Sequence, residues 1–162
     1  LAMGDALAVA LLECRGFTAE DFARSHPSGN LGKRLLLQVE DVMRSGDEIP
    51  AVGADVSVSE GLLEMTRKGL GMTAIVDKEQ RILGVFTDGD LRRTLDAEVN
   101  IHKTTMRTVM QPDCITIEAG TLAAEAVRIM EENKITSLLV ANKEKLLVGA
   151  LNVHDLFRAG VM

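Results

Sequence analysis

The chain has 162 residues, with 18 Lys and Arg against 24 Asp and Glu and a formal net charge of −6. Hydrophobic residues make up 46% of it and charged residues 26%, which indicates a folded globular protein and excludes a disordered one. The acidic balance, the lack of Tyr and Trp and the presence of only four Phe argue against nucleic acids as partners, because their binding needs cations and stacking aromatic rings. No apolar run approaches the roughly 20 residues of a membrane-spanning helix, so no membrane partner is expected.

The first 34 residues predict helices from the edge of another domain. Residues 1–14 are apolar on nearly every side of a helix, which is typical of a buried helix. A second short helix begins near Thr18 and ends before Pro27, because the residue preceding a proline avoids the helical conformation. We therefore interpret residues 1–34 as the tail of an upstream domain, and the chain as a fragment of a longer protein.

An internal repeat organises the remaining residues. Residues 60–93 align with residues 125–158 without a gap, and eight of these 34 positions are identical. Upstream of each copy, Val42-Met43 recurs as Val109-Met110. Two copies are too few for a solenoid. The repeat instead predicts two similar units, packed about a pseudo-twofold axis.

Each unit is predicted to fold as strand, helix, strand, strand, helix. Ser57 and Glu60 have the spacing of a capping box, which marks the start of a helix. Short apolar runs on both sides of a charged turn indicate a pair of buried strands. In the first unit, strands are expected at about 49–52, 73–76 and 82–86, with the last helix at 88–95. In the second unit, strands are expected at 115–117, 138–141 and 146–151, with the last helix at 153–159.

Polar residues follow the last strand of each unit at matched positions. The first unit reads Thr87-Asp88-Gly89-Asp90, and the second reads Asn152-Val153-His154-Asp155. The first turn of a helix presents backbone N–H groups that suit a phosphate, and a carboxylate one turn later can accept hydrogen bonds from ribose hydroxyls. Alternatively, Thr87 and Asn152 only cap the helices, and the acids interact with the helix dipoles. The recurrence at matched places favours ligand binding.

The doubled unit, with Gly-x-x-Thr/Asn-x-x-Asp at the end of each copy, resembles a tandem pair of CBS (cystathionine β-synthase) domains over about residues 41–160. The resemblance implies an α/β (α+β) fold with CBS domains at 41–97 and 108–162, and two clefts that bind adenosyl or other nucleotide ligands. Because the second unit has Asn152 where the family often has Thr or Ser, it departs from the pattern there. The binding residues that the resemblance implies are Thr87, Asp90, Asn152 and Asp155, with cleft walls at Ile49, Pro50, Met72, Thr73, Thr116 and Ser137.

The first 34 residues resemble the end of the sugar-isomerase (SIS) domain of bacterial arabinose-5-phosphate isomerases. Besides residues 1–8 and 15–27, the similarity includes Ser-His-Pro-Ser-Gly-Asn-Leu-Gly at 25–32, where that family has Ser-His-Pro-Gly-Gly-x-Leu-Gly. In those enzymes a CBS pair follows the SIS domain. The resemblance implies a parent enzyme that interconverts ribulose 5-phosphate and arabinose 5-phosphate, with His26 as a catalytic residue. From the residues alone, His26 reads as a helix-terminating histidine. The fragment itself is expected to be inactive, because the other active-site residues lie upstream.

Two functions remain open for the CBS pair. In the first, it binds a regulatory nucleotide, either CMP-Kdo or a cytidine nucleotide, as feedback from lipopolysaccharide synthesis, or an adenine nucleotide, as is general in the family. In the second, it binds no ligand and holds together the parent oligomer, expected to be a tetramer. A relative in sugar-alcohol metabolism has the same domain order, which leaves the pathway open.

The two cysteines bear on metal binding and on the cellular location of the protein. Cys14 and Cys114 match no metal-ligand spacing, so no metal site is expected. No required cofactor is expected either, apart from the regulatory nucleotide. With two thiols and no secretory signal, a reduced cytoplasmic location is expected.

Overall fold

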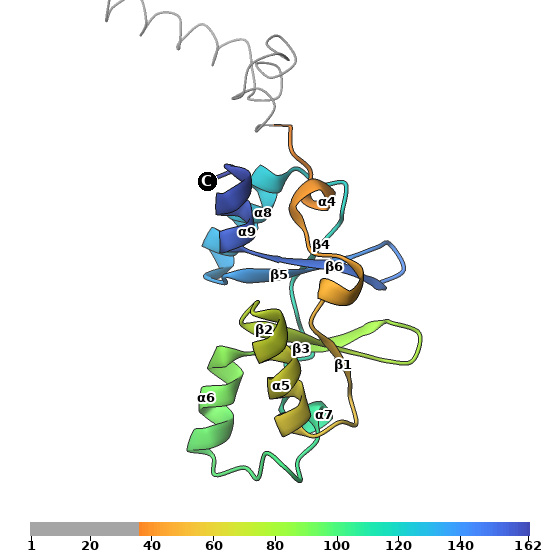
Figure 1. Ribbon diagram of the computed structural model, residues 1–162, viewed down its shortest axis with the longest axis vertical. Coiled ribbons are helices and arrows are strands. Elements are labelled where there is room, and N and C mark those ends of the chain that lie inside the picture. Colours follow the sequence, from red (N-terminus) through yellow and green to blue (C-terminus); the bar gives the residue numbers. More distant parts are fainter. Residues whose placement is uncertain (1–35) are drawn as a thin grey trace, which may run out of the picture.

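The computed structural model describes residues 36–162. The predicted tail at 1–34, with His26, lies outside the described residues. Two three-stranded sheets lie one above the other, each covered on its outer side by its own helices (Figure 1). In both sheets the first strand pairs in parallel with the second, and the second pairs antiparallel with the third. The predicted α/β fold of two similar units is confirmed.

The first unit contains the predicted elements in the predicted order. They are β1 (Ala51–Gly53), α5 (Val58–Lys68), β2 (Met72–Val76), β3 (Ile82–Thr87) and α6 (Asp88–Asp96). The side chain of Ser57 accepts a hydrogen bond from the backbone N–H of Glu60, and the Glu60 carboxylate accepts one from the backbone N–H of Ser57. This reciprocal pair is the capping box that the spacing predicts. The helix ends at Gly69, whose φ of 65° is left-handed.

The second unit repeats this arrangement. It comprises β4 (Thr116–Ile117), α8 (Ala123–Asn133), β5 (Ser137–Ala141), β6 (Leu147–Asn152) and α9 (Val153–Ala159). The register is also repeated, because Met72 faces Thr87 in the first sheet and Ser137 faces Asn152 in the second. One difference is at the end of α8, where Lys134 adopts a φ of 54° at the position equivalent to Gly69. A left-handed conformation is unfavourable for a lysine.

Three short helices were not predicted from the sequence. They are α4 (Val39–Val42), η1 (Gly46–Glu48) and α7 (Met106–Val109). Each is about one turn long, too short to show an apolar periodicity. The repeated Val-Met pairs belong to two of them, since Met43 is the C-terminal cap of α4 and Met110 that of α7.

The segments that carry α4 and α7 are exchanged between the units. The segment around α4 precedes β1 but pairs with the second unit, where the backbone N–H of Val39 donates to the carbonyl of Thr121 at 2.8 Å. Figure 1 shows α4 beside α8, away from the sheet of the first unit. The segment around α7 precedes β4 but pairs with the first unit, where the N–H of Met106 donates to the carbonyl of Val56 at 2.9 Å. Each unit is therefore completed by chain that leads into the other.

Two glycines of the repeat lie where the exchanged segments cross the sheets. A Cβ atom added to Gly84 would lie 2.5 Å from the carbonyl oxygen of Gln111, and one added to Gly149 would collide with the Met43 sulfur. Beside Gly84, the N–H of Val85 donates to the Gln111 carbonyl at 2.9 Å, and the N–H of Gln111 donates back to Val85 at 2.8 Å. The identity of Gly84 and Gly149 in the repeat therefore reflects the close approach of the exchanged segments, through backbone at Gly84 and mainly through the Met43 side chain at Gly149.

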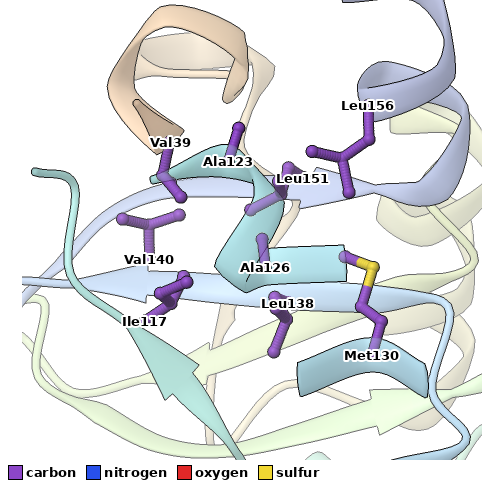
Figure 2. Packing of buried hydrophobic residues seen from close by; sticks show 9 residues of the cluster. All are labelled: Val39, Ile117, Ala123, Ala126, Met130, Leu138, Val140, Leu151 and Leu156. Atoms are coloured by element: carbon purple, nitrogen blue, oxygen red, sulfur yellow. The ribbon is translucent and has the colours of Figure 1, made fainter. Parts of the chain in front are cut away.

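Apolar side chains fill three layers. Figure 2 shows the cluster of the second unit, in which Val39 of α4 reaches down among Ala123, Val140 and Leu151. The cluster of the first unit likewise contains Met106 of α7, together with Ile75 and Phe86. The third layer lies between the sheets and contains Leu70, Met72, Ala74, Val76, Leu139, Leu147 and Ala150. The exchanged helices therefore contribute directly to the cores.

Candidate ligand-binding cleft

A cleft of about 400 Å³ opens between the two units. Its first wall is the junction between β3 and α6, and its second wall comes from the chain before β4 and from the start of β5. This volume lies within the roughly 300–1,000 Å³ of typical small-molecule sites. We call it the Asp90 cleft; its lining includes Met72, Val85, Thr87, Asp90, Arg93, Gln111, Cys114, Ile115, Lys134, Ser137 and Leu139.

Asp90 caps its own helix from the base of this cleft. The residue is only 3% exposed. Its Oδ2 accepts hydrogen bonds from the backbone N–H of Thr87 at 2.9 Å and from the Thr87 hydroxyl at 2.7 Å. In return, the N–H of Asp90 donates to the Thr87 hydroxyl oxygen. The capping role considered for Thr87 is therefore present, in a residue pair that also lines the cleft.

The other oxygen of Asp90 meets two side chains. Its Oδ1 accepts from Nε2 of Gln111 at 2.9 Å and from Nη2 of Arg93 at 2.6 Å. Burial raises the pKa of Asp90, but the hydrogen bonds from Thr87, Arg93 and Gln111 outweigh it, so that the pKa lies below its usual value. The carboxylate is therefore ionised at neutral pH and can accept hydrogen bonds from a ligand.

The equivalent residues of the second unit are arranged differently. Asn152 and Asp155 also form a capping box. Asn152 lines a smaller hollow of about 250 Å³ that shares Gly71 and Ser137 with the Asp90 cleft. Asp155 lines neither this hollow nor the one beside Arg44. Both of its carboxylate oxygens are engaged by the guanidinium of Arg44, at 3.3 Å each.

The Asp90 cleft brings together four of the predicted residues, Met72, Thr87, Asp90 and Ser137. The hydroxyl of Ser137 donates to the carbonyl of Leu70 at 3.0 Å, which joins β5 to the end of α5.

Four predicted wall residues lie elsewhere. Thr73 is fully buried, because side chains alternate along β2 and Met72 occupies the cleft-facing side. Ile49 packs against the apolar layer between the sheets. The carbonyl of the buried Pro50 accepts a hydrogen bond from the N–H of Ala74, and Thr116 is exposed on β4 and does not line the Asp90 cleft.

Several lining residues were missed by reasoning from the sequence. Gln111, Cys114 and Ile115 come from the chain between α7 and β4. The signal that marks this stretch is the repeated Val-Met pair, since Gln111 follows it directly. Burial raises the pKa of the Cys114 thiol, so that it forms a neutral part of the wall. Lys134 at the end of α8 was also missed.

The chemistry of the Asp90 cleft suits a ligand that has hydroxyl groups, a flat ring and an anionic group. Thr87 and the Asp90 carboxylate offer an acceptor site for hydroxyl groups. Val85, Ile115 and Leu139 give apolar walls for a flat ring. Two cations, Arg93 and Lys134, line the same cleft and can meet an anionic group, although the acids Asp88 and Asp113 line it as well.

Within residues 36–162, no helix has the length and apolar character needed to cross a bilayer. No group of three or more His, Cys, Asp or Glu side chains in this range is placed to hold a metal ion.

Comparison with known proteins agrees with this architecture. The CBS domain family matches residues 39–97 and 106–161. An arabinose 5-phosphate isomerase, KdsD of Pseudomonas aeruginosa, is 57% identical over all 162 residues, which correspond to 50% of that protein. The chain thus spans about half the length of this relative, and its predicted similarity to such isomerases is confirmed.

Solved structures share the fold at lower identity. The CBS domain pair of protein MJ0100, in complex with 5'-methylthioadenosine and S-adenosyl-L-methionine, has a TM-score of 0.67 at 19% identity, over 75% of this chain and 98% of that one. CBSX2 in complex with AMP has a TM-score of 0.65 at 22% identity, over 76% of this chain and 96% of that one. With the family matched in both halves of the repeat, the chain belongs to the CBS domain family as a tandem pair.

Proposed function

We propose that this CBS pair binds a nucleotide or nucleotide sugar in the Asp90 cleft, and that it regulates an arabinose-5-phosphate isomerase of which it is the C-terminal part. The observation that carries the proposal is the buried, ionised Asp90 at the base of a 400 Å³ cleft with apolar walls and two cations. The isomerase assignment is supported by the 57% identity to the KdsD enzyme. The parent reaction interconverts ribulose 5-phosphate and arabinose 5-phosphate, and the chain, which spans half the length of that enzyme, is expected to be inactive alone.

In this proposal the ribose lies against Thr87 and Asp90. Its hydroxyls donate to Oδ1 of Asp90 and take the place of Arg93, whose side chain is 67% exposed and can swing outward. A hydrogen bond to a charged group contributes about 1.5–3 kcal/mol. The released guanidinium then meets the ligand phosphate together with Lys134. Binding thus exchanges an internal ion pair for one with the ligand.

The base lies between apolar side chains of both units, namely Met72, Val85, Ile115 and Leu139. An adenine base is supported by the AMP, methylthioadenosine and S-adenosylmethionine in related folds. A cytidine base, as CMP or CMP-Kdo, is supported by the feedback logic of a pathway that leads to Kdo. Adenine and cytosine nucleotides are therefore both compared in the binding experiment.

Thermal unfolding followed by circular dichroism tests this proposal, since the chain has no Trp or Tyr for fluorescence. AMP, ATP, CMP, CMP-Kdo and S-adenosylmethionine are compared at a concentration about 100 times the dissociation constant. A ligand then adds roughly 2.7 kcal/mol and raises the midpoint by about 5–10 °C. Asp90→Asn should abolish the shift, whereas Asp96→Asn, at the far end of α6, should keep it. No shift with any of the five compounds would refute the proposal.

A second function, a ligand-free role in assembly of the parent enzyme, is favoured by apolar side chains on the outer helices. Phe157 on α9 is 71% exposed, and Leu63 on α5 is also well exposed. Large exposed apolar residues are typical of contact surfaces when they form a patch. Sedimentation of the chain and of Phe157→Ser distinguishes the roles. Loss of self-association without any nucleotide response would favour assembly.

A further inference from the structure

The two strand-to-helix junctions are equivalent in fold but face different side chains. Gln111 and Arg44 each follow a Val-Met pair directly, and each lies where an exchanged segment crosses a sheet. Gln111 donates to Asp90 of the first unit, and Arg44 donates to Asp155 of the second. The first junction therefore faces the neutral amide of Gln111, and the second faces the longer, charged guanidinium of Arg44.

Arg44 spans the second junction. Its Nε donates to Oδ2 of Asp155 and its Nη2 to Oδ1, both at 3.3 Å, while Nη1 donates to the backbone carbonyl of Lys68 at 2.7 Å. The guanidinium therefore joins the start of α9 to the end of α5. Among the described residues, Gln111 has no such second bond and does not reach the end of α8.

The consequence is a difference in access to the two carboxylates. Asp90 lines the 400 Å³ cleft, and its arginine partner Arg93 is 67% exposed. The Arg44 side chain is only 24% exposed and that of Asp155 only 7%, and Asp155 lines neither of the two hollows at its junction. The hollow beside Arg44 is lined by charged residues: Arg44, Asp47, Glu48, Arg67 and Lys68. A second hollow at this junction, beside Asn152, also includes the apolar residues Leu70 and Val153.

We propose that Arg44 closes the second cleft, so that the CBS pair binds one nucleotide per chain, in the Asp90 cleft. A ribose at Asp155 must displace two charge-assisted hydrogen bonds, each worth about 10- to 100-fold in a binding constant. It also leaves the guanidinium without its carboxylate in a partly buried position. The residue that follows the Val-Met pair thus decides whether a cleft opens. The inference rests on the proposed function and adds the stoichiometry and its determinant.

The test exchanges the two residues. Isothermal titration of the 162-residue chain with AMP, CMP and CMP-Kdo measures the number of sites. We expect one binding site in the unaltered chain and two in Arg44→Gln. In Gln111→Arg a guanidinium faces Asp90, and binding in the Asp90 cleft should be at least tenfold weaker. Arg67→Gln is the matched control. It removes the same charge beside the same hollow, where Arg67 pairs with Glu64 and not with Asp155 among residues 36–162, and should keep one site.

Each outcome of this titration either supports or overturns the inference. Two sites in the unaltered chain would overturn the inference and leave the proposed function standing, whereas no binding of any probe would overturn both. A single site in Arg44→Gln, with native circular dichroism, would also overturn the inference. If Arg44→Gln fails to fold, Gln111→Arg decides, since unchanged affinity in that variant contradicts closure by the guanidinium fork.

Discussion

Replacing Gly84 by alanine tests whether the two units cross as closely as the structure shows. The added Cβ would lie 2.5 Å from the Gln111 carbonyl oxygen and 3.1 Å from its carbon. Because these are backbone atoms, no side-chain rotation relieves the overlap, and the exchanged segment must move away. Overpacking of this kind costs about 1–3 kcal/mol. Loss of one of the two backbone hydrogen bonds between Val85 and Gln111 adds about 1 kcal/mol, so we expect about 3 kcal/mol in total.

Urea unfolding followed by far-ultraviolet circular dichroism measures this loss. A change of about 3 kcal/mol should lower the thermal midpoint by about 6–12 °C at this chain length. Gly53→Ala is the matched control, because an added Cβ there meets no atom within 4 Å and the residue also lies in a strand. The control should lie within about 0.5 kcal/mol of the unaltered chain. If Gly84→Ala is equally mild, the close crossing is refuted.

Three further predictions concern single side chains. Asp90→Asn should destabilise the fold by about 1–2 kcal/mol at pH 7. Because folding lowers the pKa of Asp90, the full difference in unfolding free energy is present above the ordinary carboxyl pKa of about 4 and should disappear as the pH falls through the pKa of the folded state. Urea unfolding at several pH values measures this difference. Lys134→Gly should stabilise the fold by about 1 kcal/mol, because it removes a left-handed lysine, and should weaken binding of a phosphorylated nucleotide in titration calorimetry. Val39→Ala, which truncates a fully buried side chain of α4, should cost about 2 kcal/mol in urea unfolding; a loss near zero would contradict the packing of α4 on the second unit.

Much of the fold could be predicted because its signals are local. The capping box at Ser57 and the charged turns between apolar runs mark the ends of elements, and the last helix was predicted at its observed bounds, Val153–Ala159. The exchange of segments could not be predicted in this way. A repeat shows that two stretches are similar, but it does not show on which copy the chain before each first strand will pack.

The residues of the candidate site were likewise predicted only where a local sequence pattern marks them. Thr87 and Asp90 were predicted because a strand-to-helix junction has a sequence pattern of its own. Gln111 reaches Asp90 from 21 residues away, across the crossing of the units, and no local pattern indicates that contact. The placement of Thr73 as a cleft wall neglected strand alternation, because Met72 and Thr73 must point to opposite faces of β2.

The crossing also explains how a repeat with similar folds can have unequal clefts. Gly84 and Gly149 are identical because both lie against an exchanged segment, Gly84 against the Gln111 carbonyl and Gly149 against the Met43 side chain and the Arg44 carbonyl. The next side chain along each segment, Gln111 or Arg44, points to a junction carboxylate and is not constrained by that contact. This close packing therefore preserves the symmetry of the fold, while the position after the Val-Met pair is free to differ. A change from glutamine to arginine there alters access to a cleft without altering the crossing itself.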